Sequence, residues 1–591
     1  MKIIRKIIGV LFVVLCFDVN CLGAYLTNIP MQITQPNGDT LTIYASGDEY
    51  YNWLHDTEGY TIVQNSEGYY VYAQYNENGD DIKASSYIVG KCNPHDVGLQ
   101  PNITNRNKII RSIMNQSRDN HLIEGYRNNR TYPTSGTINN IVIYIRFADQ
   151  SEFTDPQTKY TNLFNNSATS ANSVYNYFKE VSYNQLNVNS TFYPTNNGTT
   201  ILSYQDIHTR AYYLPNSDPL AIDSGYNNNN YITRKLELLT RAINYVKSSI
   251  PTSLNLDGNN DGDVDNVCFI IRGNNSVWNS ILWPCMINLA GSIQINNKYV
   301  TFCNVQMESV VNIKGVGVLC HEFCHSLGAP DLYHFSQDGY NPIGVWDIMA
   351  NDANPPQHMS SFIKCAYLNW IATIPEITQT GYYSLSPLQN SSNNCYKISL
   401  NGINDYLILE YRKKDGTFEN SLPNSGLIIY RIHPTINGNP QGNQYGDGAA
   451  GNYNGIYAYR KGGSIIADGD ITKATFSANS GRTRFSSNSD PQAFVSDSSI
   501  ANVLIKDVST AGNTISFYVK FCDGDNIIYS NTSNLPQVTN ASNSITTSGV
   551  VTVKNTDNIL FEAKNMVTLD KNFSVDLGGS FEINMDGCFE N

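Results

Sequence analysis

The chain has 591 residues, which is too long for one hydrophobic core, and about three to five domains are expected. Hydrophobic residues make up 41% and charged residues 15% of the sequence, a composition typical of a folded globular protein. The net charge of -13 disfavours nucleic acid or an anionic membrane surface as the main partner.

Residues 1–24 have the pattern of a secretory signal peptide. Basic residues precede an apolar run at 7–17, which is too short to cross a bilayer as a helix. Cleavage is expected near Ala24. No later run has the length and apolarity of a membrane-spanning helix. We therefore expect a protein without a transmembrane segment that is secreted, or retained at the cell surface through its C-terminal module.

The segment 25–132 is predicted to be β-rich at first and then to become a linker. Residues 25–75 alternate in hydrophobicity and contain Asn-Gly and Glu-Gly turns, which indicates β-hairpins. Residues 95–136 are rich in Asn and Arg and have weak patterning. Arg127 and Arg130 in this linker offer cleavage points to a processing protease.

The region 133–373 is predicted to mix helices and strands. Apolar runs predict buried strands, and apolar residues at helical spacing predict amphipathic helices. The expected strands are 139–147 and 264–273, and the expected helices are 171–186, 233–249, 314–327 and 359–370.

The sequence pattern of residues 374–591 predicts strands without helices. Short alternating strands separated by Gly, Asn and Pro predict a sandwich-like domain at 374–520. Hydrophobic pairs that recur at short intervals predict a small stacked β-repeat module at 521–591. Cys522 and Cys588 bracket this module and could staple it. The fold class predicted is therefore α+β and multidomain, with C-terminal all-β modules.

The stretch VGVLCHEFCHSLGAPDLYH at 316–334 carries the chemistry. His321 and His325 are four residues apart on a predicted helix, so they share one face about 6 Å apart. Both imidazoles can then reach one zinc ion at about 2.1 Å. Glu322 is placed to reach a metal-bound water rather than the metal.

The residues after this helix extend the motif. Gly328 can adopt a positive φ and end the helix, and the turn allows Asp331 to supply a third ligand. Met349, in GVWDIMAND, fits a turn under the metal. No Glu occurs between Glu322 and Glu376, which disfavours a glutamate as third ligand. The short motif alone occurs by chance on core helices, and the extension favours the metal site.

A second candidate metal site is the loop LDGNNDGDVDN at 256–266. It resembles the first part of an EF-type calcium loop, with Gly262 at the bend, but Cys268 stands where a closing Glu is expected. A polar turn without an ion is the alternative. The calcium ligands predicted are Asp257, Asn259, Asp261, Asp263 and Asp265.

Cys92, in GKCNPHD, is a candidate for control of activity. A thiolate at this position could ligate the zinc and keep the enzyme latent. The alternative, which the sequence favours, is a disulfide or a buried thiol.

HEFCHSLGAPDLY followed by WDIMA resembles the metzincin clan, and more closely the immune inhibitor A-like family of secreted bacterial metalloproteases. Stretches similar to that family extend over roughly residues 25–520. They are GDEYYNWLHDTEGYTI, INNIVIYIRFAD, SVYNYFKEVSYNQL, ILWPCMINL, HMSSFIKCAYLNWI and LILEYR…LPNSGLIIYRI. The resemblance implies a zymogen with a pro-region at 25–132 and a metzincin-like zinc protease domain at 133–373. The family's usual Gly is Cys324 in this sequence.

The resemblance further implies roles for individual residues. His321, His325 and Asp331 are the zinc ligands, Glu322 is the general base, and Met349 forms the Met-turn. The function expected is a secreted zinc endopeptidase that hydrolyses peptide bonds of extracellular proteins, with protein or peptide substrates, Zn²⁺ and also Ca²⁺. Two alternatives stay open. One is an adhesin or carbohydrate-binding surface protein with a degenerate peptidase core, and the other is an aminopeptidase.

Overall fold

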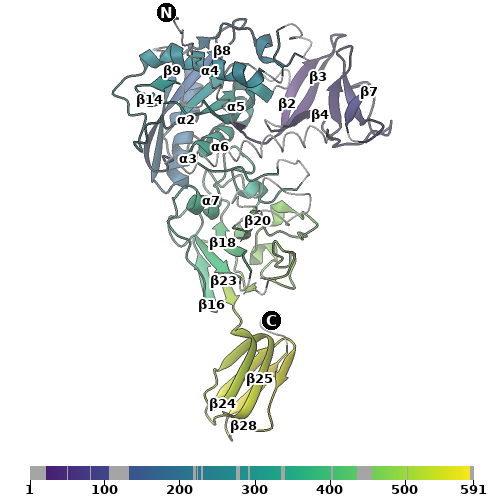
Figure 1. The fold of residues 1–591 in the computed structure, drawn as a ribbon, viewed down its shortest axis with the longest axis vertical. Helices are drawn as coiled ribbons and strands as arrows, with labels where there is room; N and C mark the ends of the chain where they lie inside the picture. The colour runs from purple at the N-terminus through teal and green to yellow at the C-terminus, as the bar shows by residue number, and fades with distance from the viewer. Residues whose placement is uncertain are drawn as a thin grey trace, which may run out of the picture.

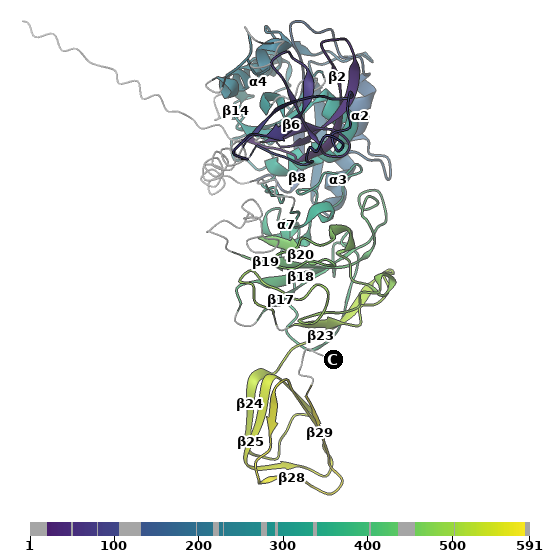
Figure 2. The ribbon, with the colours of Figure 1, turned by 90° about the vertical axis from the view of Figure 1, so that its right-hand side faces the viewer.

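A computed structural model gives the fold of the chain as an elongated stack (Figure 1). A mixed α/β region and an antiparallel sheet lie side by side at the top, two further sheets lie below them, and a small β module is at the bottom (Figures 1 and 2). The structure describes residues 21–585 apart from 49–50, 80, 106–131, 197, 217–220, 222–223, 228–229, 274–279, 290–292, 335–339, 401–402, 435–454 and 502.

The N-terminal sheet is a six-stranded antiparallel meander in which each strand pairs with the next one along the chain. It contains the hairpins that the sequence predicts, and it has a hydrophobic core of its own. Its strands are β2 (Leu26–Thr34), β3 (Thr40–Gly47), β4 (Asn52–His55), β5 (Thr61–Gln64), β6 (Tyr70–Tyr75) and β7 (Ile82–Ile88). The predicted linker cleavage points, Arg127 and Arg130, lie outside the described residues.

The central sheet of the mixed region has the order β1-β12-β15-β11-β8-β10, with β9 also paired to β8. Its inner strands β8, β11 and β15 are parallel, whereas β12 runs antiparallel and brings an edge of the sheet toward the helix α6. The strands are β1 (Cys21–Leu22), β8 (Gly136–Arg146), β9 (Leu186–Tyr193), β10 (Tyr204–Gln205), β11 (Val267–Ile271), β12 (Cys285–Asn288) and β15 (Phe302–Met307); β13 (Gln294–Ile295) and β14 (Lys298–Tyr299) form a separate hairpin.

The four predicted helices of this region are present, and two of them are shorter than expected. The helix predicted at 171–186 ends early because Tyr183 and Asn184 adopt positive φ. The helix predicted at 359–370 is followed by Asn369, also at positive φ. Two further helices, α2 and α5, were not predicted. The helices are α2 (Gln157–Asn165), α3 (Val174–Val181), α4 (Tyr231–Val246), α5 (Glu308–Lys314), α6 (Val316–Ser326) and α7 (Ser361–Ala366).

Two four-stranded sheets lie in the region 374–520, for which the sequence predicts a sandwich-like domain. The inner sheet, β17-β18-β19-β20, has one face in the core that it shares with the mixed region and the other against the outer sheet, β16-β23-β22-β21. The strands are β16 (Gly381–Leu385), β17 (Cys395–Ser399), β18 (Tyr406–Arg412), β19 (Gly426–Ile432), β20 (Ile456–Ala458), β21 (Phe485–Ser486), β22 (Leu504–Lys506) and β23 (Ile515–Lys520). Apolar packing therefore continues across the predicted boundary at 373/374.

In the region 521–591, for which the sequence predicts a stacked β-repeat, the strands pair in parallel and form a coil. Val538 pairs with Leu560, and Leu560 pairs with Glu582, so each coil advances by 22 residues. Cys522, at its start, is disulfide-bonded, and Cys588 lies outside the described residues. The strands are β24 (Gly524–Thr532), β25 (Val538–Val553), β26 (Asn558–Ala563), β27 (Met566–Thr568), β28 (Phe573–Val575) and β29 (Ser580–Asn584).

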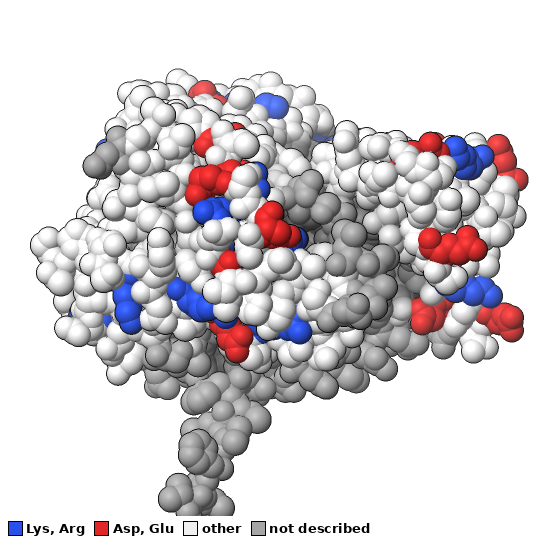
Figure 3. Space-filling model, turned by 90° about the horizontal axis from the view of Figure 1, so that it is seen from above, with Lys and Arg blue, Asp and Glu red and all other residues white. Residues whose placement is uncertain are grey.

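Charged side chains are sparse on the face of the molecule that is seen from above (Figure 3). Seen from above, Lys and Arg lie singly or in small groups beside Asp and Glu, and most of the described surface is uncharged (Figure 3). Among the described helices, none is long and apolar enough to cross a membrane.

Candidate metal centre

Helix α6 is the scaffold of the site. All of its residues are buried, and Phe323 packs on Phe178 of α3 with the ring centroids 4.9 Å apart. On another face, the Asn304 side chain donates to the backbone oxygen of Glu322 at 2.8 Å and to Ser326 Oγ at 3.1 Å. Ser326 in turn donates to Asn266. These buried hydrogen bonds fix the rotation of the helix against the central sheet.

The helix directs His321 and His325 toward Asp331, which follows the turn at Gly328. Gly328 has φ of 96°, as the sequence predicts, and lets the chain reverse. The Nε2 atoms of His321 and His325 lie 3.1 and 3.3 Å from Asp331 Oδ1. All three side chains are at most 2% exposed. The structure thus brings together the three predicted zinc ligands.

The backbone sets the tautomer of both imidazoles. His321 Nδ1 lies 2.9 Å from the carbonyl oxygen of Ile348, and His325 Nδ1 lies 2.9 Å from that of Ala329. A carbonyl can only accept, so each Nδ1 carries a hydrogen and each Nε2 presents a lone pair to Asp331. When both imidazoles are neutral, two acceptor nitrogens therefore lie close to an acceptor oxygen of Asp331. This arrangement is repulsive unless a cation lies between these atoms.

These atoms fit a metal ion. His321 Nε2, His325 Nε2 and both carboxylate oxygens of Asp331 are buried, and they have no hydrogen-bond partner among the described residues. Within the described residues they form the one group of three metal-type ligands whose atoms lie within 4.8 Å of one another. Two imidazoles and a carboxylate are a donor set that zinc takes.

The electrostatics lead to the same conclusion. Burial lowers the pKa of His321, but the Asp331 carboxylate beside Nε2 outweighs this effect and raises that pKa to about 9. Burial acts to raise the pKa of Asp331, but the two histidines lower it by more, so that its pKa lies below the usual value. A carboxylate surrounded by imidazoles in a dry site thus attracts positive charge, either a proton or a metal ion.

Glu322 is separate from the three ligands and is suited to proton transfer. Its Oε1 atom accepts a hydrogen bond of 2.8 Å from the backbone nitrogen of Ala24, and its Oε2 atom is buried without a partner among the described residues. Burial raises the pKa of Glu322 to about 8, although His321 and the Ala24 amide act in the opposite direction.

Met349, which the sequence predicts to form the Met-turn, lies beside the three candidate ligands. Met349 is fully buried, and its carbonyl oxygen accepts a 2.8 Å hydrogen bond from the nitrogen of Leu332, next to Asp331. Asp347 Oδ1 accepts from the nitrogen of Met349 at 2.9 Å. The turn is held from below by the inner sheet, because Arg412 of β18 donates to the carbonyl oxygen of Trp346.

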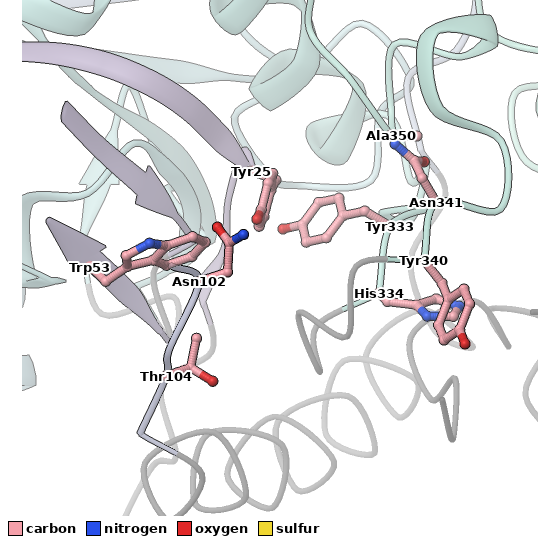
Figure 4. A pocket seen from close by; sticks show the side chains of 9 residues that line it. All are labelled: Tyr25, Trp53, Asn102, Thr104, Tyr333, His334, Tyr340, Asn341 and Ala350. Atoms are coloured by element: carbon pink, nitrogen blue, oxygen red, sulfur yellow. The ribbon is translucent and has the colours of Figure 1, made fainter. Parts of the chain in front are cut away.

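The N-terminal segment runs through the site. Tyr333 donates its hydroxyl to the carbonyl oxygen of Gly23 at 2.5 Å, and Trp283 donates its indole N–H to that of Ala24 at 3.0 Å. Beside this segment lies a cavity of about 270 Å³, in which Tyr25 and Tyr333 point toward one another (Figure 4). The other lining residues are Trp53, Asn102, Thr104, His334, Tyr340, Asn341 and Ala350.

A sequence model of the family described as immune inhibitor A peptidase M6, catalytic domain, matches residues 294–355. The predicted family resemblance is confirmed. The match contains α6, Asp331 and the Met-turn, and it identifies a peptidase domain of metallopeptidase type. It covers a small part of the chain, which as a whole is a mixed α/β multidomain protein. No curated protein matches the chain.

The predicted calcium loop is ordered by its own polar groups. Asp257 accepts from the nitrogens of Asp261 and Gly262 at 2.9 and 3.0 Å, and from Lys298 Nζ at 2.6 Å. Asp265 Oδ2 accepts from the nitrogen of Gly258 at 2.9 Å. Asn259 and Asp263 lie in the same loop and are not fully buried. The Lys298 ammonium already neutralises part of the loop, and calcium stays a prediction.

The two cysteines that the sequence singles out lie apart from the three ligands. Cys92 is a free, partly buried thiol that packs against the core of the N-terminal sheet. A thiol latch therefore stays a prediction, and the residue that contacts Glu322 is Ala24. Cys324 is free and fully buried, its pKa is raised by burial, and it interacts electrostatically with Tyr177 of α3. It is thus a protonated packing residue on the α3 side of the helix.

Proposed function

We propose that the chain is a secreted zinc-dependent endopeptidase, made as a zymogen, that hydrolyses peptide bonds of extracellular proteins. The carrying observation is the convergence of His321, His325 and Asp331, whose buried acceptor atoms require a cation. Zn²⁺ bound by these residues would supply Lewis-acid chemistry, which activates water and polarises a carbonyl.

Glu322 performs the proton transfers in this proposal. Its carboxylate takes a proton from the attacking water and passes it to the nitrogen of the leaving amine. The hydrogen bond between Glu322 and the Ala24 nitrogen supports this role, because it places the carboxylate beside a peptide nitrogen. The buried environment excludes bulk water and strengthens each electrostatic contact.

Two features support an endopeptidase made in latent form. The chain continues on both sides of the Gly23–Ala24 bond, through β1 before the bond and toward β2 after it. An endopeptidase needs such room on both sides, because it cleaves bonds inside a peptide chain. The same segment would exclude a substrate from the chain before its signal peptide is removed. It includes residues 21–24, the last four residues of the predicted signal peptide, while residues 1–20 lie outside the described residues. N-terminal sequencing of the secreted and active forms tests this.

The alternative functions receive less support. An adhesin with a degenerate peptidase core would be expected to have lost some of the site residues. In this chain the three candidate ligands and Glu322 are all present and buried. An aminopeptidase needs a site closed on one side of the scissile bond, in contrast to the continuous path of residues 21–28.

The experiment combines metal analysis with cleavage of casein and of a peptide blocked at both ends. We expect about one zinc per chain at the ligand site, internal cleavage, loss of activity with a chelator, and loss in Glu322→Gln. Glu237→Gln, at a half-exposed position on α4, is the matched control and should keep full activity. A zinc-loaded protein that leaves both substrates intact after activation would refute the proposal.

A further inference from the structure

One peptide group of the N-terminal segment is held at both of its polar atoms. The nitrogen of Ala24 donates to Glu322 Oε1 at 2.8 Å, and the carbonyl oxygen of Gly23 accepts from the Tyr333 hydroxyl at 2.5 Å. Ala24 is fully buried, and Tyr333 is 5% exposed. The Gly23–Ala24 bond is therefore clamped between the predicted general base and a phenol.

The residues around this bond are bound as an extended peptide would be. Cys21 and Leu22 pair antiparallel with Ile287 and Met286 of β12, so the segment adds a strand to the sheet edge. On the other side of the bond, Trp283 Nε1 donates to the carbonyl oxygen of Ala24 at 3.0 Å. Backbone groups make these contacts, so they do not depend on the side chains of the bound peptide.

We propose that the Gly23–Ala24 group occupies the position of a scissile peptide, and that Tyr333 is a catalytic residue that donates a hydrogen bond to the substrate's carbonyl oxygen. In the same pose, Trp283 binds the carbonyl of the residue that follows the scissile bond. This inference rests on the proposed peptidase function and deepens it.

Hydrolysis of the peptide bond in this pose is an addition followed by an elimination. The water oxygen bonds to the carbonyl carbon, its proton goes to Glu322, and the carbonyl π electrons move onto the oxygen that Tyr333 contacts. The carbon–nitrogen bond then breaks, its electron pair goes to nitrogen, and the proton on Glu322 follows it. Because negative charge on the oxygen grows in the first step, a hydrogen bond to that oxygen stabilises the transition state more than the ground state.

The position of Tyr333 is well defined by its surroundings. Its ring lies against Tyr25, with centroids 5.4 Å apart, and the backbone of Leu332 is hydrogen-bonded to Met349. Asp331 precedes it by two residues, so the loop that places a metal ligand also places the phenol. A hydroxyl held in this way needs little reorganisation during the reaction.

The first test compares kinetics of zinc-loaded variants after identical activation, with a doubly blocked peptide as substrate. Tyr333→Phe should lower kcat by about 100-fold with little change in KM, as expected when one oxyanion donor is removed. Trp283→Phe should raise KM by about 5- to 10-fold, the effect of one neutral hydrogen bond to bound substrate. Tyr411→Phe is the matched control, because the Tyr411 hydroxyl also donates to a backbone carbonyl, that of Gly512, in the sandwich.

The second test does not depend on turnover. A phosphinic pseudopeptide imitates the tetrahedral oxyanion, whereas a peptide hydroxamate binds chiefly through chelation. Calorimetry should show about 100-fold weaker phosphinic binding to Tyr333→Phe, with hydroxamate affinity and zinc content unchanged.

The outcomes separate the two proposals. If the wild-type protein does not cleave the blocked peptide, the proposed function fails, and the difference between phosphinic and hydroxamate binding still decides the role of Tyr333. If the wild-type protein is active and Tyr333→Phe keeps kcat within about threefold, Tyr333 is not the donor. A loss that accompanies lower zinc content or lower thermal stability would also overturn the assignment, because it marks a structural role.

Discussion

Arg412 of β18 joins the inner sheet to the mixed region through buried hydrogen bonds. Its side chain is fully buried and donates to Glu419 at 2.5 and 2.8 Å, and to Glu410 at 3.2 Å. It also donates to the carbonyl oxygens of Trp346 and His358, on either side of the Met-turn. One guanidinium thus compensates two buried carboxylates and ties the turn to the inner sheet.

We expect Arg412→Met to lower the free energy of unfolding by about 3–5 kcal/mol, the cost of leaving a buried ion pair with one partner. The estimate applies because neither Glu410 nor Glu419 reaches solvent. The double variant Arg412→Met, Glu419→Gln removes one of the stranded charges and should recover about 1–2 kcal/mol of the loss.

Urea unfolding followed by tryptophan fluorescence, at saturating zinc, measures both values. Lys413→Met, a neighbouring substitution at a more exposed position, is the control and should change stability by less than about 0.5 kcal/mol. A loss below about 1 kcal/mol in Arg412→Met, or a double variant as unstable as the single one, would contradict the compensation of buried charge described above.

Four further outcomes are expected. Asp331→Asn should weaken zinc binding at least about 100-fold in competition with a chromogenic chelator, and a wild-type-like affinity would exclude Asp331 as a ligand. Burial raises the pKa of Glu180 to about 7, so the folded protein keeps a proton that the unfolded chain loses. The free energy of unfolding of the wild type should therefore fall relative to that of Glu180→Gln as pH rises from about 4.5 to 7. The expected difference is about 1 kcal/mol, because the Glu180 side chain is 36% exposed. Urea unfolding that gives both proteins the same dependence of stability on pH would refute this prediction. Deletion of 521–591, which has a core cluster of its own, should leave peptidase activity within about twofold, and a larger loss would show that the module is part of the catalytic unit. If the loop 256–266 binds calcium, addition of calcium to zinc-loaded protein should raise the melting temperature. An unchanged melting temperature would mean that calcium does not add to the charge that the Lys298 ammonium already supplies to Asp257.

The grouping of the three candidate ligands can be predicted from the sequence because the information is local. His321, Glu322 and His325 take their relative positions from helical periodicity, and Gly328 fixes where the helix ends. The stacked C-terminal coil is predictable for the same reason, since its apolar pairs recur along the chain. Helix α5 was missed because only Gly315, at φ 56°, separates it from α6.

Residues that act through distant partners give no comparable signal. Tyr333 meets Gly23 across 310 residues, and Trp283 meets Ala24 across 259 residues. Before the fold is known, each is one more aromatic residue in a chain with 40 tyrosines and 5 tryptophans. Asn304 could have been suspected, because a polar side chain inside an apolar strand usually has a buried partner.

If Asp331 is the third ligand, the charge of the site follows from the donor set. Two neutral imidazoles and one carboxylate around a divalent ion would leave one positive charge. A third imidazole in place of Asp331 would leave two, at a considerable further cost in a buried region. In the proposed substrate pose, Tyr333 and Trp283 would hold the peptide by hydrogen bonds to its carbonyl oxygens, so the site would accept backbone rather than a particular charged side chain.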